Sequence, residues 1–77
     1  MKLEELLRDT LFLPDSVQIT DEAGPGRLEG WDSLGHITLI SAVENSFNVS
    51  FDMDEIIMIE SLNDLKRLLL LKGVKDI

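Results

Sequence analysis

The sequence contains no cysteine and only two prolines, and its apolar runs, such as Leu68–Leu71, are short. Without cysteine there can be no disulfide or thiolate metal site, so packing alone has to hold the fold, and the composition fits the cytoplasm. A membrane span needs about 18 consecutive apolar residues, so we expect none. The charges throughout Met1–Leu11 also argue against a signal peptide.

Basic residues are scarce as well. The 7 lysines and arginines face 15 acidic residues, which gives a net charge of −8. This excess of negative charge disfavours nucleic acids and anionic membranes as partners and favours proteins with basic surfaces. Apolar residues make up 44% of the 77 residues, which is enough for a small core. We therefore expect a single folded domain over residues 1–77 that is monomeric.

Apolar residues recur at helical spacing in four segments. The segments are Met1–Phe12, Ser33–Asn48, Phe51–Ile59 and Ser61–Leu71. Between the first two, Pro14–Asp32 has no sustained apolar period and contains several glycines and prolines, which predicts a loop. Loops of this length within a small domain are often functional. The pattern as a whole predicts an all-α fold, a four-helix bundle with a long first loop and a short third helix.

Polar residues suited to capping stand where the predicted helices begin. Asp32 and Ser33 are both good N-cap residues for the second helix. Ser61, followed by Asp64 three positions later, forms a weak capping box for the fourth helix. Gly73 is placed to end that helix.

The segment Gly30–His36 reads Gly-Trp-Asp-Ser-Leu-Gly-His and lies where the long loop gives way to the second helix. With Asp32-Ser33-Leu34 opening a helix in a small acidic chain, the sequence resembles the acyl carrier protein family. The resemblance continues downstream through Val43, Glu44, Phe47, Val49, Phe51, Ser61, Leu62 and Leu65. The lead-in Gly30-Trp31 differs from that of fatty-acid-synthesis carriers and of peptidyl carriers, which favours a free-standing, specialised carrier.

This resemblance implies a carrier rather than an enzyme. Ser33 would receive 4′-phosphopantetheine from coenzyme A through a phosphopantetheinyl transferase, and Asp32 would assist this transfer. The thiol of the arm would hold acyl groups as thioesters for fatty acid, polyketide or other specialised biosynthesis. The other implied partners are an acyl-loading ligase or acyltransferase and a ketosynthase or other acyl-processing enzyme. A helix N-terminus suits the attachment because its free N–H groups and dipole favour a phosphodiester, although Ser33 could also be a plain N-cap.

The resemblance also places partner contacts along the second helix, on Leu34, Ile37, Ser41 and Glu44. Glu44 is the only acid between Leu34 and Phe47, whereas fatty-acid-synthesis carriers are dense in acids there. Ile57 and Met58 stand where charged residues are common, and they form either an exposed partner site or, in a rotated helix, part of the core. The apolar residues expected around a cargo cleft, which equally suit an ordinary core, are Leu39, Val43, Phe51, Ile56, Ile59 and Leu65.

Trp31 and His36 flank the Asp-Ser-Leu motif without an expected chemical role. We expect Trp31 to pack the loop onto the bundle rather than to meet a partner. His36 is expected to be an ordinary exposed histidine that can pair with Asp32, four residues earlier on the helix surface.

Two other functions are disfavoured and one stays open. A hydrolase using Ser33 is disfavoured because the single histidine, three residues away on the same helix, does not suit a nucleophile–base arrangement. A calcium loop starting at Asp52 would need glycine and glutamate where Ile57 and Asn63 stand, so no metal site is expected. The open alternative is a small acidic helical adaptor, without a cofactor, that binds a basic protein partner.

Overall fold

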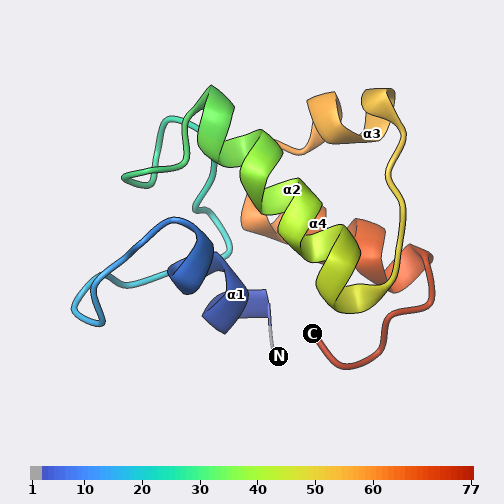
Figure 1. Ribbon diagram of the computed structural model, residues 1–77, viewed down its shortest axis with the longest axis horizontal. Helices are drawn as coiled ribbons and strands as arrows, with labels where there is room; N and C mark the ends of the chain where they lie inside the picture. The colour runs from blue at the N-terminus through green and yellow to red at the C-terminus, as the bar shows by residue number, and fades with distance from the viewer. Residues whose placement is uncertain (1–2) are drawn as a thin grey trace.

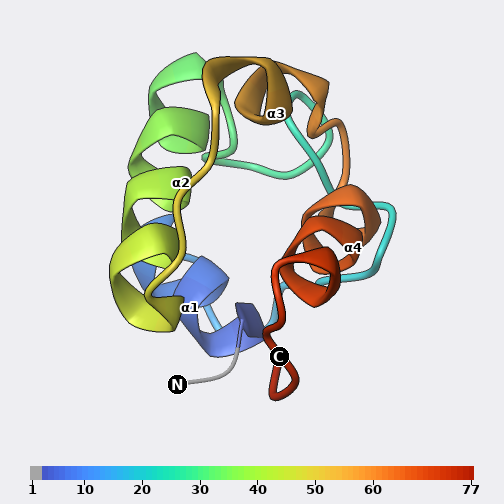
Figure 2. The same cartoon turned by 90° about the vertical axis from the view of Figure 1, so that its right-hand side faces the viewer.

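The computed structural model describes residues 3–77, which form four α-helices and no β-strand. The helices are α1 (Leu3–Thr10), α2 (Ser33–Phe47), α3 (Met53–Met58) and α4 (Leu62–Leu71), as Figure 1 shows. In Figure 2 they surround a common centre, with α2 and α4 on opposite sides, α3 at one end and α1 at the other. The predicted all-α architecture, with a long first loop and a short third helix, is confirmed.

The first helix is shorter than its apolar pattern predicted. Of the predicted segment Met1–Phe12, the first two residues lie outside the described residues, and α1 ends at Thr10. Phe12 has a left-handed backbone, with a φ of 56°, and its side chain is 91% exposed. In a continued helix, residues two positions apart face different sides. The turn at Phe12 instead lets Leu11 and Leu13 both reach the core.

The core is formed by buried apolar residues from α1, α2, α4, the long loop and the segments beside α3. Its members are Leu3, Leu6, Leu7, Leu11, Leu13, Ala23, Trp31, Leu39, Ile40, Val43, Phe51, Ile59, Leu62, Leu65 and Leu69. The helix α3 itself contributes no fully buried side chain. It is anchored by its two flanking residues, Phe51 and Ile59, so its own helical turns rest on the surface of the core.

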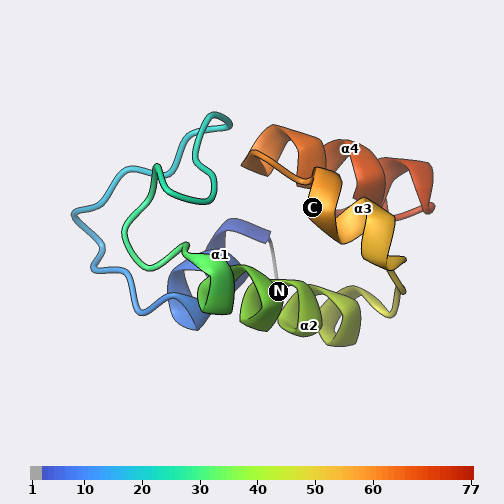
Figure 3. The same ribbon diagram turned by 90° about the horizontal axis from the view of Figure 1, so that it is seen from above.

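The long loop, residues 11–32, is fastened to the start of α4. Figure 3 shows the loop lying beyond the first turns of α2 and α4. The Leu62 N–H donates to the Ala23 carbonyl over 2.7 Å, and the Asn63 N–H donates to the Asp21 carbonyl over 3.0 Å. The Lys66 ammonium lies 2.6 Å from the Asp21 carboxylate. The loop therefore accepts two N–H groups that a helix N-terminus leaves without partners.

The same loop is also held to α1 and to the core. The Arg8 guanidinium donates to the carbonyls of Pro14 and Val17, over 2.8 and 2.9 Å. Ile19 and Leu28 pack against the core from the loop. Although it has no regular secondary structure, this segment is tied down along most of its length, which allows it to shape a site.

Both α3 and α4 begin with a capped turn, and the cap of α4 is the predicted one. Asp52 precedes α3, and its backbone N–H donates to the Glu55 carboxylate over 2.8 Å. Ser61 precedes α4, and its hydroxyl accepts the N–H of Asp64 over 3.2 Å. Gly73 follows α4 with a φ of 93°, a left-handed conformation that ends a helix readily.

Candidate functional site

Asp32 is the N-cap of α2. Its backbone is extended, and its Oδ1 accepts the N–H of Gly35 over 2.8 Å. Of the two candidate caps, Asp32 takes the role and Ser33 becomes the first residue of the helix. The Ser33 side chain is exposed where the N–H groups of the first turn have no partners within the helix. An exposed hydroxyl on a rigid helix end, beside a partial positive charge, suits a phosphodiester.

Gly35 allows the preceding loop to approach the first turn of α2 closely. A Cβ at this position would overlap the carbonyl oxygen of Gly30 and come within 3.2 Å of Asp32 Oδ1. From the sequence, Gly35 only weakens the helix, because glycine costs about 1 kcal/mol relative to alanine. The structure supplies the reason for it: a side chain here would push the loop away from the Asp32 cap.

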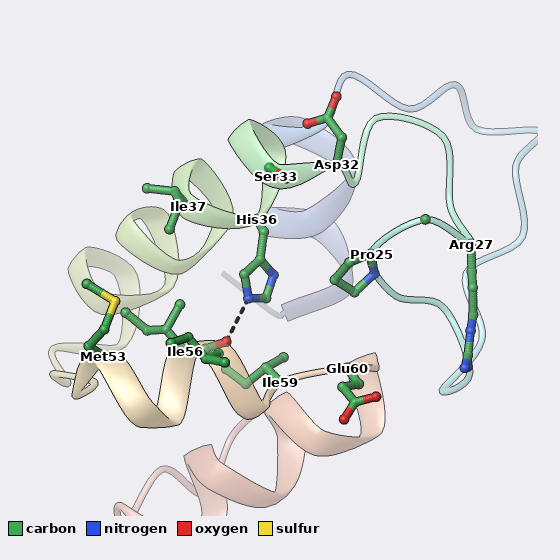
Figure 4. A pocket seen from close by; sticks show the side chains of 12 residues that line it. Pro25, Arg27, Asp32, Ser33, His36, Ile37, Met53, Ile56, Ile59 and Glu60 are labelled. Carbon is green, nitrogen blue, oxygen red and sulfur yellow. Dashed lines mark hydrogen bonds between the residues drawn. The ribbon is translucent and has the colours of Figure 1, made fainter.

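A cavity of about 700 Å³ opens beside Ser33 (Figure 4). Its walls come from the long loop, the first turns of α2, α3 and the segment after α3. The lining residues are Pro25, Gly26, Arg27, Asp32, Ser33, His36, Ile37, Met53, Ile56, Ile57, Ile59 and Glu60. The side toward α3 is apolar, whereas charged groups stand near the loop. A cavity of this size and composition is typical of sites that hold small organic groups.

His36 does not behave as the sequence analysis expected. We predicted an exposed histidine paired with Asp32, but the ring is partly buried and points toward α3 (Figure 4). Its Nδ1 accepts the Nε1–H of Trp31 over 2.9 Å, and its Nε2 lies 2.9 Å from the carbonyl oxygen of Ile56. The prediction was wrong because Asp32 is occupied in capping the helix, which leaves it turned away from His36 (Figure 4).

Trp31 packs inside the bundle, as the sequence analysis predicted. Its side chain is 1% exposed, and the indole lies nearly parallel to the His36 ring, with 6.1 Å between the ring centroids. The buried indole N–H needs an acceptor, and His36 supplies it. The two residues on either side of the Asp-Ser-Leu motif are therefore linked to each other.

The six residues predicted to surround a cargo cleft separate into two groups. Ile56 and Ile59 line the cavity beside Ser33. The other four, Leu39, Val43, Phe51 and Leu65, are buried in the core and do not line it. Their role in holding cargo stays a prediction, since in this structure they serve as ordinary core residues.

The predicted partner surface is largely exposed. Leu34 is 76% exposed, Ile57 69% and Met58 71%, so the alternative in which a rotated α3 buries the last two is wrong. Ile37 and Ser41 are exposed on α2 as well.

Glu44 differs from the rest of the predicted partner surface. It is half-buried, and its Oε2 accepts the backbone N–H of Phe51 over 2.8 Å. The single carboxylate of α2 is therefore engaged in joining this helix to the segment before α3.

On α3, one carboxylate has a perturbed acidity. The backbone N–H of Asp52 and the Lys72 ammonium, 3.0 Å away, lower the pKa of Glu55. Lys72 also lies over the ring of Phe51, 5.2 Å from its centroid. These contacts join α3 to the end of α4.

Two negative findings apply to residues 3–77. This part of the chain contains no group of three or more histidine, aspartate or glutamate side chains arranged to hold a metal ion. Within it, each helix is too short or too polar to cross a membrane.

The chain matches a protein-family model. The model described as phosphopantetheine attachment site matches residues 2–69, which include the whole of the cavity lining. Neither the curated proteins nor the solved structures give a match.

Proposed function

Because this chain belongs to the phosphopantetheine attachment site family, we propose that it carries acyl groups on a 4′-phosphopantetheine arm attached to Ser33. The family match bears out the resemblance to acyl carrier proteins and the identity of the covalent cofactor. The assignment of the arm to Ser33, the cargo and the pathway are proposals. When attached, the arm supplies a terminal thiol, which can hold acyl groups as thioesters in a chain that has no cysteine.

The observation that carries this proposal is the position of Ser33. Its hydroxyl is exposed, is not used as the helix cap, and stands at the mouth of a cavity of about 700 Å³. A phosphodiester on this oxygen would lie by the N-terminus of α2, where the helix dipole favours negative charge. The neighbouring Asp32 carboxylate opposes that charge. We assign Asp32 to holding the first turn and to assisting the transferase reaction.

The lining of the cavity suits the cargo of such an arm. Ile37, Met53 and Ile57 give it an apolar wall, which suits an acyl chain, and the loop side offers one cation, Arg27. We propose that cargo rests here first, against Ile56 and Ile59. Leu39, Val43, Phe51 and Leu65 become accessible to it only if the core opens.

Carriers of this family present their cargo to acyl-processing enzymes, and the exposed residues suggest where. We propose that partners dock on Leu34, Ile37 and Ser41 of α2 and on Ile57 and Met58 of α3. Glu44 is a weaker candidate because its carboxylate is engaged by Phe51.

With few free acids on α2, we propose a specialised pathway rather than housekeeping fatty acid synthesis. The partners would be a phosphopantetheinyl transferase, an acyl-loading ligase or acyltransferase, and a ketosynthase or similar enzyme. We further propose that residues 1–77 act as one monomeric carrier domain in the cytoplasm and catalyse no reaction themselves.

The test is intact-mass spectrometry after incubation with coenzyme A and a broad-specificity phosphopantetheinyl transferase. The chain should gain one phosphopantetheine, located on the peptide that contains Ser33, and Ser33→Ala should gain none. Ser46→Ala is the matched control, because Ser46 is another exposed serine of α2 that lies outside the proposed docking surface, and it should be modified like the unaltered chain. Modification of Ser33→Ala would show that the site is wrong. An unchanged mass, under conditions that modify a control carrier, would favour the adaptor without a cofactor.

A further inference from the structure

The helix α3 forms one wall of the cavity but is weakly held by its own side chains. It has six residues and buries none of them fully. Its ends are fixed by Phe51 and Ile59 in the core. Between these anchors, the partly buried Ile56 packs against the core, and polar contacts add to this packing. On the side facing Ser33, the polar contact is the one between His36 and the Ile56 carbonyl.

The partners of His36 define the state of its ring. An indole N–H can only donate, so the Nδ1 that receives the Trp31 N–H has to present a lone pair. A carbonyl oxygen can only accept, so the Nε2 that faces Ile56 has to carry the proton. The two contacts together select the neutral Nε2–H tautomer. Nδ1 therefore only accepts a hydrogen bond and Nε2 only donates one, and the buried indole orients the ring.

The bridge stands within the cavity wall. Ser33 and His36 are three residues apart on α2, so they are neighbours on the same helix face. His36 and Ile56 both line the cavity, and Figure 4 shows the imidazole reaching from α2 to the backbone of α3. The Ile56 carbonyl also accepts the Ile59 N–H, over a longer 3.3 Å. The end of α3 is therefore stabilised both from within its own chain and from α2.

We propose that His36 is a positioning residue that fixes α3 as the far wall of the cavity beside Ser33. Through the Trp31–His36–Ile56 hydrogen bonds, it sets the separation of α2 and α3 and hence the space open to a group attached at Ser33. The role in cargo binding rests on the proposed function, whereas the bridge itself does not. Glutamine can both donate and accept at this position, and phenylalanine can do neither.

The bridge is tested first on the unmodified chain by NMR. The ¹⁵N spectrum of the His36 imidazole should show a protonated Nε2 and an unprotonated Nδ1 at neutral pH. In His36→Phe, the backbone amides of Ile56 and Ile59 should exchange with solvent about two- to tenfold faster, as expected for the loss of one hydrogen bond. His36→Gln should restore much of the protection. Thr38→Ala is the control, because it removes a hydrogen bond within α2 that does not reach α3.

Two results on the unmodified chain would overturn the proposal. One is an Nδ1–H tautomer, or a doubly protonated ring, in the unaltered protein at neutral pH. The other is unchanged amide exchange at Ile56 and Ile59 in a folded His36→Phe. Because neither measurement needs the cofactor, these outcomes are independent of whether Ser33 is the attachment site.

The consequence for cargo is tested on the modified chain loaded with a short saturated acyl group. Loading should shift the methyl signals of Ile56 and Ile57 in the unaltered protein and in His36→Gln, and should shift them less in His36→Phe. Equal shifts in all three proteins would contradict the role of His36 in setting the cavity. Failure of attachment itself would instead be recognised beforehand, from the intact mass.

Discussion

Replacing Gly35 by alanine sets two physical effects of opposite sign against each other. In an isolated helix the change would stabilise by about 1 kcal/mol, because glycine loses more backbone entropy on folding. Here the new Cβ would overlap the carbonyl oxygen of Gly30, which is backbone and cannot rotate away. Overpacking of this kind costs about 1–3 kcal/mol. The Cβ would also lie 3.2 Å from Asp32 Oδ1 and weaken a cap that is worth about 1 kcal/mol. The structure thus predicts a net loss of about 1–3 kcal/mol.

The assay is urea unfolding followed by the fluorescence of Trp31, the only tryptophan in the chain. Asn45→Ala is the control, because Asn45 is exposed in the middle of α2 and its replacement should stabilise by up to about 0.7 kcal/mol. In a domain of this size, a loss of about 1 kcal/mol lowers Tm by roughly 4–8 °C. If Gly35→Ala were as stable as Asn45→Ala, the close approach of the loop would not constrain the site.

Two further predictions concern the cavity walls. Gly24→Ala should destabilise by about 1–3 kcal/mol in the same urea assay, because its Cβ would overlap the Glu60 carbonyl oxygen; unaltered stability would show that the loop can move away. The Asp52 N–H and Lys72 lower the pKa of Glu55, so its carboxylate stabilises the fold at neutral pH and loses this effect as the pH falls below about 4. Glu55→Gln should therefore be less stable at neutral pH and lose less stability on acidification, and parallel pH profiles for the two proteins would contradict this.

The helices and their caps could be predicted because they depend on local sequence. Apolar spacing indicated all four helices, and Ser61 marked the start of α4. The choice between Asp32 and Ser33 as the cap of α2 needed the backbone conformation, since either side chain can accept the N–H groups of the first turn.

The environment of His36 and the need for glycine at position 35 could not be predicted from the sequence. Both depend on contacts between segments, whereas apolar spacing describes each segment by itself. His36 meets a carbonyl 20 residues away, and the space at Gly35 is occupied by the loop before α2. Backbone carbonyls have no sequence signature, so neither contact could be recognised from residue types. The family motif directed attention to Ser33 but carried no information about the space next to it.

The two walls of the cavity are held in place by different contacts. Hydrogen bonds and an ion pair fasten the irregular loop to the start of α4. The helix α3 buries none of its side chains fully and is held by the packing of Ile56, by its buried flanking residues and by the contact with His36. We expect a bulkier occupant to be accommodated by displacing α3 against the His36 contact, and α3 also bears the exposed Met58 outside the cavity. Through this displacement, an enzyme that touches only the exterior could sense the size of the occupant.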